Sequence, residues 1–236
     1  MKHFKIITLI AFLLALITLS CQNEDIPNQT ILKIEEYGKI HNESVHFLLN
    51  KYPNHNLPKD FNTLNNDLQT MMQGKYPEIY NSVERLKFND YLSNENQVFV
   101  FEDFYNNIKK IAIKEGASSE LIDFYDLMFL QFKENRSFSK KEIKDIENLI
   151  KKEAEIKNIA IFNSIYDSSK ILWSKEVSNV SFNHSRGCDP EIQVIMADGI
   201  SGGLLAFISG PFGAFGGAAI SAIVKAQQND NYGGCI

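Results

Sequence analysis

Hydrophobic residues between positions 30 and 182 recur at steps of three and four, the spacing that places them on one face of an α-helix. The clearest of these stripes runs from Ile34 to Tyr52 and is closed by Pro53. Further helices are expected over Phe61–Met71, Ile79–Leu86, Val98–Ile111, Leu121–Phe132, Ile143–Ile150 and Ile161–Leu172. No segment shows a convincing strand-like alternation. Because each apolar stripe needs cover from another helix, we expect an all-α bundle of about six to eight helices.

Several residues mark the ends of these expected helices. Gly74 and Gly116 follow the second and fourth stripes, where glycine commonly ends a helix. Ser139 with Glu142 three residues later is a capping-box pattern, in which each residue satisfies a backbone N–H of the other. A helix is therefore predicted to start at Ser139.

The composition changes after Pro190. No charged residue lies between Asp198 and Lys225, and seven of the chain's 13 glycines fall in that interval. Small residues recur four apart, which lines them along one helix face and lets two backbones approach closely. The glycines expected to serve this close packing are Gly199, Gly203, Gly210, Gly213 and Gly217.

Three interpretations of the apolar region 190–228 remain open. A single transmembrane helix fits its length, but Gly210-Pro211 interrupts the middle. A helical hairpin turning at Gly210-Pro211, with arms near 192–209 and 212–227, would form the buried centre of the bundle. The same hairpin entering a membrane is the third; in this respect the segment resembles the glycine-zipper regions of small pore-forming bacteriocins.

The N-terminus has the pattern of an export signal. Lys2 and Lys5 precede an apolar stretch from Ile6 to Leu19 that is short for a membrane span. Ser20-Cys21 at its end resembles the lipobox of bacterial lipoproteins, although Leu19 stands one place later than that family prefers. We expect residues 1–20 to be a lipoprotein signal peptide and Cys21 to carry the lipid. An ordinary signal peptide or an N-terminal anchor helix is the alternative.

Residues 21–29 are expected to be a linker between the lipid and a single helical domain, 30–236. The acidic run after Cys21, Gln22 to Asp25, resembles the tag of surface-exposed lipoproteins of the Bacteroidota type. Residues 1–20 hold two lysines and no acid, so their removal takes the formal net charge from −5 to −7. An acidic chain argues against nucleic acid as a partner, because phosphate binding needs basic patches.

Two cysteines remain once Cys21 is lipidated. Cys188 and Cys235 bracket the glycine-rich region, and an antiparallel hairpin would bring its two ends together. In an oxidising compartment an even pair favours a disulfide. We therefore predict a Cys188–Cys235 bridge; two unpaired thiols are the alternative.

Candidate polar residues are few. His41 and His46 are five apart rather than the four of a zinc-binding helix, so they point to different faces. His41 falls on the apolar stripe, which favours a hydrogen-bonded core histidine, and Asn42 is expected to face solvent or a neighbouring helix. Asp198 begins the apolar run, where a capping or packing role is favoured over catalysis. No metal site and no cofactor are expected.

A wider resemblance rests on three short blocks. The chain is similar to a group of uncharacterised bacterial lipoproteins in these blocks. They are Gly38 to Asn42, Ser168 to Trp173, and the C-terminal Ala197-Asp198-Gly199 with the following Gly-Pro and Gly-Ala pairs. The resemblance implies location and architecture, and it implies no activity.

The sequence therefore predicts a lipid-anchored protein of the outer membrane, with the acidic tag favouring surface exposure. A structural or binding role with an envelope protein as partner is the favoured class. A membrane-active, pore-forming or antagonistic role of the hairpin is the second class. An enzyme is the least favoured, because no catalytic constellation stands out.

Overall fold

The computed structural model describes residues 32–53, 57–58, 61–82, 99–134, 139–177 and 190–230. Residues 32–236 form a compact unit of their own, separate from residues 1–31. The described part of this unit contains helices and no strand, which confirms the all-α expectation. The helices are α2 (Ile34–Lys51), α3 (Phe61–Lys75), α4 (Pro77–Ser82), α5 (Phe101–Lys114), α6 (Ser119–Glu134), α7 (Lys140–Glu147), α8 (Glu153–Val177), α9 (Pro190–Ser209) and α10 (Phe212–Asp230).

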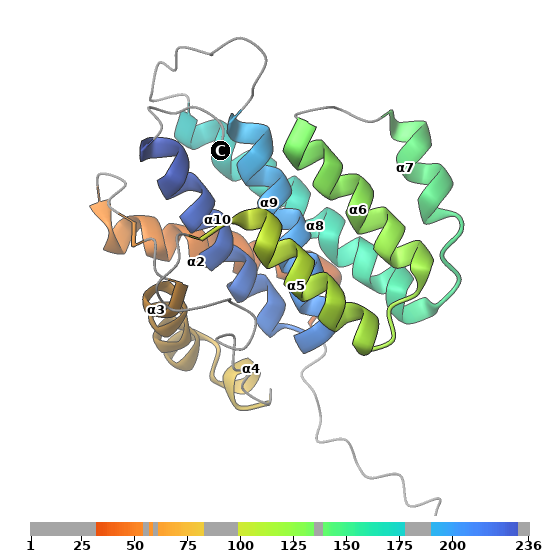
Figure 1. Cartoon of the computed structure of the whole chain (residues 1–236). Coiled ribbons are helices and arrows are strands. Elements are labelled where there is room, and N and C mark those ends of the chain that lie inside the picture. The colour runs from red at the N-terminus through yellow and green to blue at the C-terminus, as the bar shows by residue number, and fades with distance from the viewer. Residues whose placement is uncertain are drawn as a thin grey trace, which may run out of the picture. The chain divides into compact units, whose positions relative to one another are not determined.

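The hairpin formed by α9 and α10 is the centre of this bundle (Figure 1). α9 packs against α10, α8, α6 and α5, while α10 packs against α9, α2 and α3. The short helices α4 and α7 lie further out and pack on α3 and α6. The two most apolar helices therefore receive their cover from the amphipathic ones.

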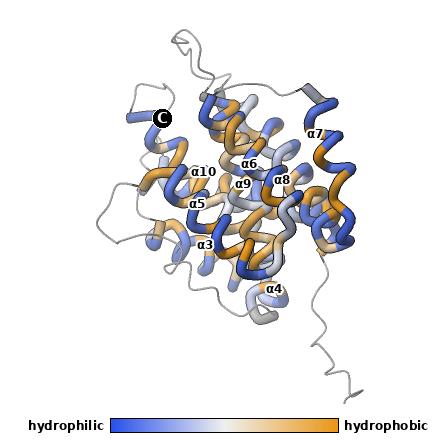
Figure 2. Tube along the Cα trace, turned by 45° about the vertical axis from the view of Figure 1, so that its right-hand side comes forward, coloured by the Kyte–Doolittle hydropathy of each residue, from blue (hydrophilic) through white to orange (hydrophobic). Residues whose placement is uncertain are grey.

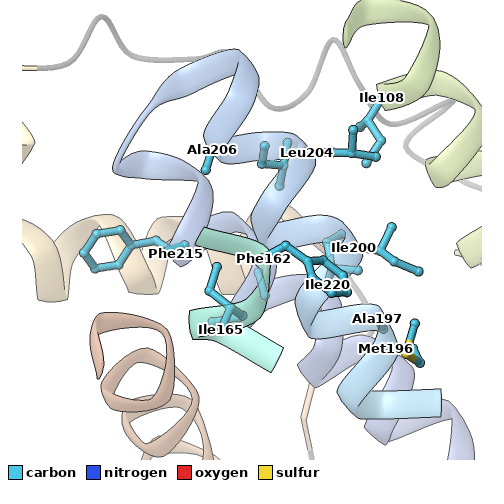
Figure 3. Packing of buried hydrophobic residues seen from close by; sticks show 14 of the residues in the cluster. Ile108, Phe162, Ile165, Met196, Ala197, Ile200, Leu204, Ala206, Phe215 and Ile220 are labelled. Atoms are coloured by element: carbon cyan, nitrogen blue, oxygen red, sulfur yellow. The ribbon is translucent and has the colours of Figure 1, made fainter. Parts of the chain in front are cut away.

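Burial along the hairpin is continuous. α9 is buried at every residue from Gln193 to Ala206, and α10 from Phe212 to Ala226. Ile200, Leu204 and Ile220 pack there with Phe162 and Ile165 of α8 (Figure 3). A helix that is apolar on all sides needs such complete cover. The buried hairpin is the arrangement found in this structure.

A turn at Gly210-Pro211 joins the two arms. Gly210 has a φ of +62°, a left-handed conformation that glycine adopts without strain. Pro211 then precedes the first residue of α10. The interpretation of 190–228 as one continuous transmembrane helix is therefore wrong, because the chain reverses at this turn.

Glycines set the distance between the hairpin arms. A Cβ atom on Gly213 would overlap the backbone of Leu205 and Ala206, and one on Gly217 would lie 2.7 Å from the Gly202 Cα atom. At both glycines the backbone of α10 therefore lies directly against the backbone of α9. Gly202, which the sequence analysis did not single out, belongs to this contact.

The other expected close-packing glycines divide into two kinds. A Cβ on Gly199 would lie 2.8 Å from the Phe162 ring, and one on Gly203 would overlap the Tyr125 hydroxyl. Both positions therefore admit aromatic side chains of α8 and α6. Gly210 has no neighbour within 4 Å of such an atom, so its assignment to close packing is wrong and its role is the turn.

Helix ends agree with several of the sequence signals. Ser139 and Glu142 form the expected capping box, and Gly116 adopts a φ of +93° just after α5. α3 continues through Gly74 to Lys75, because one glycine costs a helix only about 1 kcal/mol. The stripe expected to reach Ile150 is interrupted: α7 ends at Glu147 and the chain turns to bury Ile150.

Hydropathy follows this layering. Hydrophilic and hydrophobic residues alternate along outer helices such as α5 and α7 (Figure 2). The core side chains of α5 and α6 include the aromatic pairs Tyr105–Phe129, stacked at 4.2 Å, and Phe101–Phe132 at 4.4 Å between ring centroids. These rings join the two helices that cover one side of α9.

A buried carboxylate connects α6 to α8. Glu155 of α8 is only 1% exposed. It accepts hydrogen bonds from the Ser118 backbone N–H at 2.8 Å and from the Ser118 hydroxyl at 2.6 Å, at the start of α6. Lys152 lies 3.1 Å away. Burial by itself raises the pKa of Glu155, but the hydrogen bonds from Ser118 and Lys152 outweigh it and hold the pKa below its usual value.

A methyl group added at the hairpin contact should destabilise the protein. Gly213→Ala forces α9 and α10 apart, and overpacking of this kind costs about 1–3 kcal/mol. Urea unfolding followed by circular dichroism would measure the loss. The matched control is Gly74→Ala, also inside a helix but with no neighbour within 4 Å, which should gain up to about 1 kcal/mol from helix propensity. Equal stability of the two variants would contradict the close approach.

The Glu155 contact should make stability depend on acidity. Because the folded pKa is lowered, the stabilisation is present above the unfolded pKa of about 4.3 and is lost as the pH falls through the folded value. Glu155→Gln should cost about 2 kcal/mol near neutral pH and flatten the acid limb of the stability profile. Glu153→Gln, exposed on the same helix, should leave that limb unchanged. A flat profile in the unmodified protein would refute the contact.

Candidate functional site

A buried polar cluster, defined by His41, Asn42, Trp173 and Asp198, lies between the hairpin and two covering helices. Asp198 projects from the middle of α9 and is 0% exposed. His41 of α2, also 0% exposed, places its Nε2 atom 3.0 Å from the Asp198 Oδ1 atom. Trp173 of α8 donates its Nε1–H to the Asp198 Oδ2 atom at 2.7 Å. One carboxylate therefore connects α2, α8 and α9.

The contact between His41 and Asp198 is close but lacks the linear alignment of an ideal hydrogen bond. Neither His41 Nε2 nor Asp198 Oδ1 has a hydrogen-bond partner elsewhere in the described part of the chain. Two buried polar atoms at 3.0 Å with no other partner depend on each other for compensation. We therefore treat the pair as a buried electrostatic contact.

Asn42 completes the cluster on the other side of the imidazole. The His41 Nδ1 atom lies 3.3 Å from the Asn42 Oδ1 atom. Asn42 in turn donates its Nδ2–H to the backbone carbonyl of Ser168 at 2.8 Å. The expected interhelical role of Asn42 is therefore observed, and it joins α2 to α8.

The local sequence explains how His41 reaches so deep. Gly38 lies one turn earlier on α2, and a Cβ there would overlap the Ser164 carbonyl and the Ser168 hydroxyl. Its backbone N–H donates to the Ser164 hydroxyl at 3.2 Å. This close approach of α2 to α8 brings His41 within reach of α9.

A buried lysine of the hairpin lies near the cluster. Lys225 of α10 is 5% exposed, and its Nζ atom sits 5.9 Å from the centre of the Trp173 ring. A cation over an indole face is a favourable arrangement, more so where water is excluded. Trp173 thus contacts a carboxylate through its ring N–H and a cation through its face.

A second set of buried hydrogen bonds holds α9 about one turn further along the helix. The Tyr125 hydroxyl of α6 donates to the Asn158 Oδ1 atom of α8 at 2.7 Å. Asn158 donates its Nδ2–H to the Gly203 carbonyl of α9 at 2.8 Å. Complete burial raises the pKa of Tyr125 well above its ordinary value, so the hydroxyl remains a donor.

The three weak candidates from the sequence, His41, Asn42 and Asp198, thus meet in one cluster. His41 is the core histidine expected from the apolar stripe. The interpretation of Asp198 as a residue near a helix N-terminus is wrong, because α9 begins at Pro190, two turns earlier. The carboxylate is instead a buried acceptor.

Sequence reasoning did not identify Trp173, Lys225 or Asn158 as site residues. Two of these residues do stand out in the sequence, although neither points to a partner: Lys225 is the first charged residue after the apolar run, and Trp173 is the chain's single tryptophan. Periodicity alone places such residues on a face but does not say which helix covers that face. The cluster could be recognised only once the structure showed which helices pack against each other.

The remaining candidates lie elsewhere. Cys21, Cys188 and Cys235 fall outside the described residues, so the lipid attachment and the disulfide stay predictions. Within the described ranges, no group of three or more His, Cys, Asp and Glu side chains is placed to hold a metal ion.

Removing the imidazole should be costly. His41→Ala leaves the Asp198 Oδ1 atom buried beside an empty space, and a buried polar group left without a partner costs about 1–3 kcal/mol. Chemical unfolding monitored by Trp173 emission would measure it, since Trp173 reports directly on the cluster. Adding Asp198→Asn to His41→Ala removes the orphan charge and should recover part of the loss.

The control for this prediction is His46→Ala. His46 is exposed on the same helix, so its removal should leave stability unchanged within the error of the measurement. A His41→Ala protein as stable as the His46→Ala protein would contradict the assignment of the pair as a major contact.

Comparison with known proteins adds no assignment to these geometric observations. No protein-family model, no curated protein and no solved structure matches the chain. The function is accordingly argued from the chain's own residues.

Proposed function

We propose that this is a lipid-anchored cell-envelope protein whose helical unit, residues 32–236, serves as a structural or binding module. The sequence supports the anchor, through the cationic start, the apolar stretch and Cys21. Attachment to the outer membrane, with an envelope protein as partner, completes the proposal.

The observation that carries the module role is the burial of the polar cluster. His41 and Asp198 are both 0% exposed, and every polar contact they make reaches another helix or a neighbouring residue. A substrate would have to displace a core helix to reach them. Their position supports a role in holding the hairpin to its cover.

Exposed apolar residues support a binding role. Leu149, in the turn before α8, is 59% exposed, and Ile156, near the start of α8, is 52% exposed. Lys151 and Lys152 lie between them. Exposed apolar side chains with lysines beside them suit a partner surface that offers both apolar and acidic groups.

One observation favours the second candidate, a membrane-active hairpin. The segment Glu191–Ser209 is long and apolar enough to cross a membrane, although 78% of its most apolar window is buried inside the bundle. In this alternative α9 and α10 leave the bundle and enter a bilayer. The buried helix of a bundle has the same composition, so the alternative ranks second.

Two preparations test both parts of the proposal. The full chain, produced in a Gram-negative host with radiolabelled palmitate, should carry label that Cys21→Ala abolishes and Cys188→Ser retains. The purified unit 32–236, mixed with phospholipid vesicles in a density gradient, should stay in the soluble fraction with and without reductant. We expect this result because α9 and α10 are buried within the unit and offer no apolar face to a bilayer.

The outcomes separate the two claims. Unlabelled full-length protein would refute the anchor and leave the module untouched. Flotation of the 32–236 unit with vesicles would refute the module and make the membrane-active hairpin the leading function. Flotation only after reduction would add that the Cys188–Cys235 pair restrains the hairpin.

A further inference from the structure

Two hydrogen bonds show how α8 runs beside the hairpin. Asn158, near the start of α8, donates to the Gly203 carbonyl in the second half of α9. Trp173, near the end of α8, donates to Asp198, which comes earlier in α9. The two helices are therefore antiparallel. The start of α8 lies at the same end of the bundle as the hairpin turn.

Two other connections lie at this end, in the lower right of Figure 1. The Ser118 backbone N–H, just before α6, donates to Glu155 in the first turn of α8. Lys152, just before α8, donates from its Nζ atom to the Gly116 carbonyl at 2.9 Å. The turn between α5 and α6 therefore adjoins the turn between α7 and α8.

The start of α2 also lies toward this end. The Gly38 N–H donates to the Ser164 hydroxyl, and Asn42, one turn later on α2, donates to the Ser168 carbonyl, one turn later on α8. The two partners advance together, so α2 and α8 run in the same direction. The chain therefore enters the helical unit at the end where α8 starts.

This end of the bundle, which we call the anchor end, comprises residues 32–34, 113–118 and 148–157. It exposes three large apolar side chains: Ile113 is 50% exposed, Leu149 59% and Ile156 52%. Each comes from a different segment, namely the last turn of α5, the α7–α8 turn and the first turn of α8. Covering such side chains with an apolar phase is favourable in proportion to the area removed from water.

Charged residues stand directly beside these apolar ones. Lys114 and Lys157 each follow an exposed isoleucine and are exposed themselves. A lysine can extend its ammonium group to a phosphate while an apolar neighbour lies deeper. Exposed Glu115 and Glu153 offset much of the positive charge. Attraction to a lipid surface would therefore depend on apolar burial more than on anionic headgroups.

The length of the tether favours this end of the unit for contact with lipid. Residues 22–31 separate the proposed lipid on Cys21 from Leu32, and a chain of this length spans at most roughly 40 Å when extended. α8, with 25 residues, is itself about 37 Å long. A tether this short holds the anchor end near the bilayer at high effective concentration, where a weak contact suffices.

We propose that the anchor end rests on the phospholipid surface that carries the Cys21 lipid, with Ile113, Leu149 and Ile156 among the headgroups. The inference rests on the proposed lipid anchor, and it names the partner of the exposed apolar residues near the start of α8. A phospholipid surface offers acyl chains and phosphate groups together. The opposite end of α8, with exposed Ile171, then points away from the membrane and is open to the protein partner.

The contact holds only while the tether is present. Three side chains of four carbon atoms each contain fewer carbons than a myristoyl chain, which by itself gives only marginal membrane binding of about 10⁴ M⁻¹. The untethered 32–236 unit therefore stays in the soluble fraction. The hairpin remains inside the bundle throughout.

Tryptophan emission tests this orientation. The full chain, lipidated in its host, is reconstituted into phosphatidylcholine vesicles with or without bromine on the acyl chains, which quenches nearby tryptophans. Ile156→Trp places a reporter at the anchor end, and Ile171→Trp places a matched one at the other end of α8, where Ile171 is 58% exposed. Because interfacial side chains lie about 5–10 Å into the headgroup boundary, bromine should reduce the added emission of Ile156→Trp at least about twofold and leave that of Ile171→Trp unchanged.

The outcomes separate this inference from the anchor itself. Ile113→Trp is an independent reporter on α5 and should be quenched like Ile156→Trp. Equal quenching of Ile156→Trp and Ile171→Trp, or of neither, in lipidated protein would overturn the inference and leave the anchor standing. Protein without lipid would remove both. Quenching of Trp173 in the unmodified protein would overturn the inference in favour of a released hairpin, because Trp173 is buried against α9.

Discussion

The contact of α9 with α10 is possible only because side chains are missing from it. At Gly213 and Gly217 the opposing backbone occupies the space that a Cβ would need. The faces of α9 and α10 that point away from this contact are mostly apolar as well. Such a hairpin cannot remain open to water, so the amphipathic helices around it exist as a layer that covers it.

Apolar contacts alone leave the rotation of such a hairpin poorly defined, because many apolar surfaces fit one another similarly. Directional contacts at two levels of α9 remove this ambiguity. Asp198 must meet Trp173 and His41, and the Gly203 carbonyl must meet Asn158. A rotated or shifted α9 would bury these groups without partners, at a cost that the native arrangement avoids. The polar groups thus select one packing.

Much of the architecture could be predicted from the sequence, because periodicity and end signals act within one helix. The hairpin turn at Gly210-Pro211 and the cap at Ser139 are local in this sense. The start of α8 was missed because Glu155 and Asn158 are polar residues in buried positions, compensated by Ser118, Tyr125 and Gly203 from other helices. The role of Asp198 was missed for the same reason. A buried polar residue is explained by its partner, which sequence spacing does not reveal.

The polar cluster also bears on the choice between bundle and bilayer. A hairpin that left the bundle would carry Asp198 and Lys225 with it and leave His41 and Trp173 behind. A charged side chain near the centre of a membrane helix costs about 2.5–3.5 kcal/mol even by the milder insertion scale. The apolar composition of the hairpin suits both environments, whereas its two charges have partners in the bundle. Their placement therefore weighs against release, and it makes the bundle the state in which this sequence is most completely satisfied.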